Sequence, residues 1–96
     1  MTNILEIIEL RSVIKNRQEV IILIENLLEN ELNQTNVEMK IYTHSSFITD
    51  YSVHLYYQVD DDSSFESNLG YELSTYLRDY GLVSRNTWIE KKMDRK

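Results

Sequence analysis

The chain lacks cysteine and proline, and it has only two glycines among 96 residues. The absence of cysteine excludes disulfides, thiolate zinc sites and cysteine nucleophiles. With no proline and so little glycine, no stretch has the composition of a linker between domains. We therefore expect residues 1–96 to form a single small domain, with a charged tail over residues 92–96.

Basic residues and long hydrophobic runs are also scarce. The chain has ten lysines and arginines but 16 acidic residues, which gives a net charge of −6. Nucleic acids and anionic membranes favour basic surfaces, so neither is expected as a partner. The longest apolar run, residues 20–24, is far too short to span a bilayer. Glu6 and Glu9 break any signal-peptide pattern, and we expect a cytoplasmic protein.

A two-residue alternation organises the middle of the chain. Over residues 51–60, apolar and aromatic side chains occupy the odd positions, a pattern that predicts a strand. Residues 37–44 alternate in the same way, and residues 45–50 would form the turn of an antiparallel hairpin. If the two apolar sets share a face, opposed residue numbers must sum to an even value. Tyr42, His44, His54 and Tyr56 then share the other face.

Two segments show helical spacing. We predict helices over residues 17–33 and 64–80, after capping boxes at Asn16 with Glu19 and at Ser63 with Glu66. Gly81 would end the second helix in a left-handed conformation. The side chains predicted to be buried are Val20, Leu23, Ile24, Leu27, Leu28 and Leu32 in the first helix, and Phe65, Leu69, Leu73, Tyr76, Leu77 and Tyr80 in the second.

Residues 4–14 and 82–90 complete the pattern as the first and last strands. The order βαββαβ is that of a ferredoxin-like α+β fold. In that fold a four-stranded antiparallel sheet carries both helices on one face, and its first and third strands are central. The face without helices is called the open face below. A second copy would bury its large aromatic side chains, so we expect a homodimer. The alternative is that these aromatics are simply scattered and exposed. The interface candidates are Tyr42, His44, His54, Tyr56 and Trp88.

Recognisable catalytic motifs are missing. His44 and His54 are the only histidines, and the pattern places no carboxylate beside them as a third ligand. We expect no metal and no other cofactor. No glycine-rich loop could cradle a phosphate, and no serine is spaced to pair with a histidine.

The βαββαβ order, the aromatic segment Leu55-Tyr56-Tyr57-Gln58-Val59 and the short helix after it resemble the dimeric α+β barrel superfamily. Within it, the pattern is most similar to the antibiotic-biosynthesis monooxygenase-like domains. The resemblance implies that two sheets pack face to face, and that a small hydrophobic molecule binds between each sheet and its helices. It also implies that any enzymatic activity would be a cofactor-free monooxygenation. The second helix has no histidine at the haem-ligand position, which argues against haem degradation.

Two functions remain open. The first is a small aromatic ligand in the sheet–helix cleft, lined by Tyr57, Tyr76 and Tyr80, with Arg11 or Arg85 as polar anchors. These tyrosines could equally be core residues whose hydroxyls reach the rim. The second is a non-catalytic oligomeric or regulatory module that uses the open face. A cavity in the cleft would favour the first function, and a filled core the second.

Overall fold

A computed structural model describes residues 2–12, 17–32, 37–60 and 68–93. Both predicted capping boxes lie wholly or partly outside these ranges. The element order confirms the predicted βαββαβ pattern. The elements are β1 (Thr2–Ser12), α1 (Arg17–Leu32), β2 (Val37–Thr43), β3 (Asp50–Val59), α2 (Asn68–Leu77) and β4 (Gly81–Ile89).

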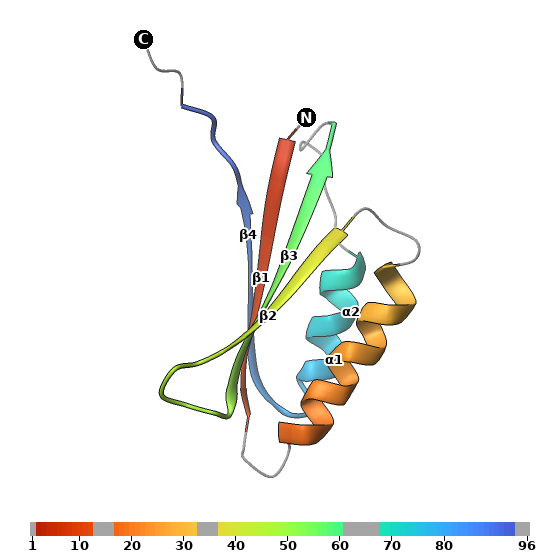
Figure 1. Ribbon diagram of the computed structural model, residues 1–96, viewed down its shortest axis with the longest axis vertical. Helices are drawn as coiled ribbons and strands as arrows, with labels where there is room; N and C mark the ends of the chain where they lie inside the picture. The colour runs from red at the N-terminus through yellow and green to blue at the C-terminus, as the bar shows by residue number, and fades with distance from the viewer. Residues whose placement is uncertain (1, 13–16, 33–36, 61–67, 94–96) are drawn as a thin grey trace.

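The four strands form one antiparallel sheet in the order β2-β3-β1-β4. The first and third strands are therefore central, as predicted. Both helices lie side by side on the same side of the sheet (Figure 1). The other side is the open face. None of the helices in the described ranges is long and apolar enough to cross a membrane.

The register of the hairpin agrees with the sequence pattern. Met39 pairs with Leu55 and Lys40 with His54, so opposed residue numbers do sum to an even value. In β1 the even positions face the helices: Ile8 and Leu10 are buried there, whereas Glu9 and Arg11 are exposed on the open face. The structure thus shows which face of β1 packs on the helices, which the mixed composition of this strand does not decide.

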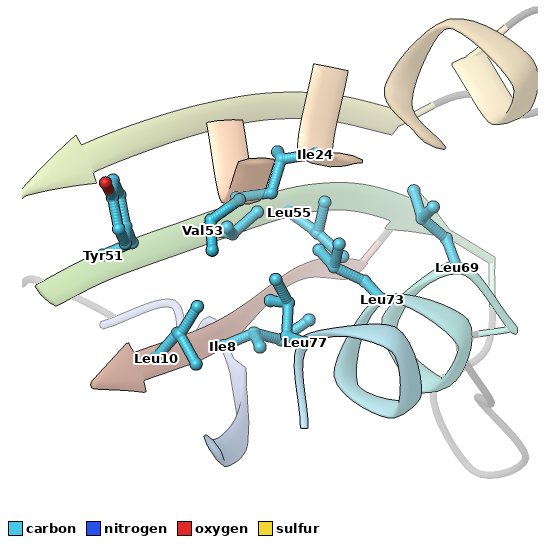
Figure 2. Packing of buried hydrophobic residues seen from close by; sticks show 10 residues of the cluster. Ile8, Leu10, Ile24, Tyr51, Val53, Leu55, Leu69, Leu73 and Leu77 are labelled. Atoms are coloured by element: carbon cyan, nitrogen blue, oxygen red, sulfur yellow. The ribbon is translucent and has the colours of Figure 1, made fainter. Parts of the chain in front are cut away.

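The core lies between the sheet and the two helices. Figure 2 shows leucines of α2 directed toward Ile8 and Leu55 of the central strands. Burying each such side chain contributes roughly 1.5–3 kcal/mol. The buried cluster consists of Ile8, Leu10, Val20, Ile24, Tyr51, Val53, Leu55, Leu69, Leu73 and Leu77.

The end of the second helix differs from the prediction. The helix stops at Leu77, and a tight turn follows, in which the Tyr80 N–H donates to the Leu77 carbonyl at 2.9 Å. Tyr76 lies on the outer side of α2 and is 48% exposed, so its predicted burial is wrong. The left-handed conformation predicted for Gly81 is also wrong, because neither glycine has a positive φ. β4 begins at Gly81 itself, and an added Cβ there would lie 2.8 Å from the carbonyl carbon of Arg11.

Candidate functional site

A carboxylate is completely buried in the layer between the sheet and α2. Glu6 occupies an even position of β1, between Ile4 and Ile8, so the alternation turns its side chain toward the helices. Its exposure is 0%. An unpaired charge at such a position would cost several kcal/mol, so the partners of Glu6 decide whether it can remain ionised.

Two side chains from the neighbouring strands reach the Glu6 carboxylate. The Arg85 Nε on β4 donates to Glu6 Oε2 and forms an ion pair with it. The Tyr57 hydroxyl on β3 donates to Glu6 Oε1 at 3.5 Å. The strand register explains the convergence, because Tyr57 lies opposite Ile4 and Arg85 opposite Ile8, one same-face position to either side of Glu6.

A glycine lets α2 lie directly on this carboxylate. A Cβ built on Gly70 would overlap Glu6 Oε1 and Cδ and would lie 2.5 Å from Oε2. Ser74, which is also buried, donates from its hydroxyl to the Gly70 carbonyl at 2.8 Å. Glu6, Tyr57, Gly70 and Arg85 are called the Glu6 cluster below.

The charges of the cluster balance one another. The Arg85 side chain is 32% exposed, so it runs from the solvent rim at β4 into the buried layer. Every buried side-chain nitrogen or oxygen in the described ranges has a hydrogen-bond partner. The cluster is therefore a polar centre with satisfied hydrogen bonds inside a mainly aliphatic layer.

The five ligand candidates predicted from the sequence do not all meet. Tyr57 and Arg85 come together at Glu6, and Tyr80 packs on the core from the turn after α2. Tyr76 points outward, and Arg11 lies on the opposite side of the sheet, because it occupies an odd position of β1. The interface candidates are considered below with the open face.

Sequence reasoning did not single out Glu6 or Gly70 as site residues. Two signals are present in the sequence. Glu6 occupies the same alternating face as Ile4 and Ile8, where an apolar residue is expected, and Gly70 is an isolated glycine within a helical pattern.

The open face carries an aromatic group. The ring centroids of Tyr42 and His54 lie 4.6 Å apart, and those of His54 and Tyr56 lie 6.4 Å apart. Partial burial and then a hydrogen bond with Tyr42 raise the pKa of Tyr56 above its ordinary value. His44 lies apart, because its Nδ1 accepts the backbone N–H groups of Ser46 and Phe47 in the β2–β3 turn.

A serine does pair with a histidine on this face, contrary to the prediction. Ser52 Oγ lies 2.9 Å from His54 Nε2. Residues two apart on a strand share a face, so the spacing of Ser52 and His54 is itself a signal for this pair. Within the described ranges, no group of three or more histidine, cysteine or acidic residues could hold a metal ion.

Two hollows in the surface of the described residues are lined mainly by open-face residues and the hairpin turn. The larger, of about 810 Å³, includes Leu5, Tyr56 and Trp88, and Trp88 is 60% exposed. The smaller, of about 670 Å³, includes Arg11, Tyr42 and His44. The larger hollow also touches helix-facing positions of the strands, namely Ile4, Val37 and Tyr57. Between the sheet and the helices, the described hydrophobic side chains form one buried cluster.

Solved structures share this fold. A conserved protein from Methanosarcina mazei Go1 has a TM-score of 0.75 at 16% identity, covering 95% of each chain. A candidate oxidoreductase from Bacteroides thetaiotaomicron has a TM-score of 0.72 at 10% identity, covering 93% of this chain and 98% of its own. A candidate antibiotic biosynthesis monooxygenase from Nitrosomonas europaea has a TM-score of 0.68 at 11% identity, covering 95% and 90%.

At these identities the likeness establishes the fold. No protein-family model and no curated protein matches the sequence. The predicted resemblance to the antibiotic-biosynthesis monooxygenase-like proteins is thus confirmed at the level of architecture.

Proposed function

We propose that this chain, whose fold is that of the antibiotic-biosynthesis monooxygenase-like proteins, binds a small aromatic molecule between its sheet and α2. One observation carries the proposal. A buried glutamate and an arginine from a neighbouring strand meet inside a layer that is mainly aliphatic.

Stability alone does not account for such a pair. Replacing a buried ion pair with apolar side chains of similar volume is often neutral or stabilising by about 1–4 kcal/mol. A domain of 96 residues has little stability to spare, so a charged pair in its core calls for another reason. Buried charges of this kind gather at functional sites, where they orient ligands.

The chemistry of the cluster defines the ligand class. A carboxylate accepts a hydrogen bond, a guanidinium donates one, and the Tyr57 hydroxyl can do both. An aromatic ring bearing a hydroxyl group matches this set, since the hydroxyl can donate to Glu6 and the ring can lie against Leu73. Arg85 at the rim would meet the ligand first. Because Glu6 is completely buried beneath α2, binding to its carboxylate requires α2 to move outward from the sheet.

Naphthol, a fluorescent phenol, provides the test. We expect Glu6→Gln and Arg85→Met each to weaken naphthol binding about tenfold or more, the loss that a charge-assisted hydrogen bond of about 1.5–3 kcal/mol predicts. Arg11→Met is the matched control, because Arg11 lies on the opposite face of the sheet. Circular dichroism establishes that each variant is folded. Equal affinity in all four proteins, or no binding by the native chain, would reject the proposal.

A second candidate function rests on the open face. This candidate is a non-catalytic oligomeric module that uses the open face as its surface, because the buried hydrophobic cluster occupies the other face of the sheet. Leu82 and Trp88 on β4 are 76% and 60% exposed, and the ring group at His54 lies two strands away. Burying such apolar area stabilises an assembly by roughly 25 cal/mol per Å². A homodimer through this face is compatible with ligand binding on the other.

Sedimentation equilibrium tests the homodimer. Tyr56→Asp places a charge in the proposed interface, so it should shift the chain to monomer. Tyr71→Asp is the control, because Tyr71 is 64% exposed on α2, away from the open face. A native chain that stays monomeric at high concentration contradicts the dimer. Dissociation by Tyr71→Asp alone would place the interface on the helices.

A further inference from the structure

We infer that His54 makes the association of two copies through the open face dependent on pH, with protonation favouring the monomer. This inference rests on the proposed homodimer and concerns its regulation. His54 lies at the middle of β3, a central strand, so a partner covering this face would also cover its ring.

The surroundings of His54 favour the neutral ring once it is covered. On β2, Lys40 lies directly opposite it and the Tyr42 ring lies 4.6 Å from its own; on β1, Ile7 lies opposite it. Along β3 itself, its Nε2 meets Ser52 Oγ at 2.9 Å, and its ring is followed by that of Tyr56. Among the described residues, His54 forms no ion pair with a carboxylate.

Two of the carboxylates on this face have other contacts. Glu38 forms an ion pair with Lys40 at 3.9 Å, and Asp50 accepts a hydrogen bond from Thr49. Glu9 is exposed and lies opposite Ser52, which is one same-face position along β3 from His54. A proton on His54 would therefore add a second cation beside Lys40. In the monomer water solvates that cation, but in the dimer the interface removes the water.

Two copies carry two such histidines, and this sets the size of the effect. With protonation confined to the monomer, each histidine can raise the dissociation constant by at most about tenfold per unit fall in pH. Two histidines can therefore raise it by at most about 100-fold per unit between about pH 7.5 and about pH 5.5. A symmetric interface makes both sites count equally.

Sedimentation velocity across this pH range, with the native chain, His54→Gln and His44→Gln, tests the inference. His44 is the matched control, because its ring accepts two backbone N–H groups in the turn and could itself respond to acid. We expect the pH dependence to vanish in His54→Gln and to persist in His44→Gln. Glutamine can still hydrogen bond to Ser52.

The outcomes separate this inference from the homodimer itself. A native chain that is monomeric at neutral pH refutes the homodimer, and the inference with it. A dimer whose dissociation constant is the same at neutral and acidic pH refutes the inference and leaves the homodimer standing. Loss of the pH response in His44→Gln instead of His54→Gln also overturns the assignment to His54.

Discussion

Gly70→Ala probes the contact between α2 and the buried carboxylate. The added methyl group has no room, because its Cβ would overlap the Glu6 carboxylate, which Arg85 holds in place. Either α2 must lift from the sheet or Glu6 must leave Arg85. Both changes disrupt the Glu6 cluster, so the variant should lose stability although alanine is the better helix former.

The magnitude follows from two opposing contributions. Replacing glycine in a helix stabilises by at most about 1 kcal/mol. Overpacking costs about 1–3 kcal/mol, and parting a buried charge from its partner adds to that cost. We expect a net loss of about 2 kcal/mol, which lowers the melting temperature of a domain of this size by about 8–16 °C.

A double-variant cycle isolates the cause. All three atoms nearest the built Cβ belong to the Glu6 carboxylate, so Glu6→Ala removes the clash. In that background Gly70→Ala should stabilise the protein, by up to about 1 kcal/mol. Thermal unfolding followed by circular dichroism measures all four proteins. An equal loss of stability with and without Glu6 would refute the proposed contact.

Three further changes have defined outcomes. Leu77→Ala removes a fully buried side chain and should cost about 2–5 kcal/mol in urea unfolding, whereas a loss below 1 kcal/mol would contradict the packing. Gly81→Ala should cost about 1–3 kcal/mol, and Arg11→Ala should not rescue it, because the clash is with the Arg11 main chain. Ultraviolet titration should find the pKa of Tyr56 above the usual value of about 10 and lowered by Tyr42→Phe, so the free energy of unfolding should fall as the pH rises past that value.

How well each strand could be predicted depends on how regularly its apolar and polar residues alternate. In β3 every odd position is apolar or aromatic, and this fixed its face and its register with β2. β1 was less informative, since Leu5 and Ile7 on its open face are as apolar as Ile8 and Leu10 on the other. Its orientation became clear only from what packs against it.

The candidate site was predicted only in part. Tyr57 and Arg85 were chosen as polar residues able to hold a ligand, but what joins them is Glu6, which was treated as an interruption of the pattern. The cluster combines β1, β3, β4 and α2, so no local spacing reveals it. The predicted burial of Tyr76 is wrong for a related reason, because helical spacing alone does not exclude Tyr76 from the buried stripe. In the structure, the side chains of α2 that meet the sheet include those of Leu73, Ser74 and Leu77.

The central claim is that the Glu6 cluster binds a small aromatic molecule. Titrating the isotopically labelled chain with naphthol, and recording amide shifts by nuclear magnetic resonance, tests it most directly. We predict that the largest shifts fall on the four residues of the Glu6 cluster and on their neighbours in α2. Shifts concentrated at Tyr56 and Trp88 on the open face, or none at saturating naphthol, would contradict it.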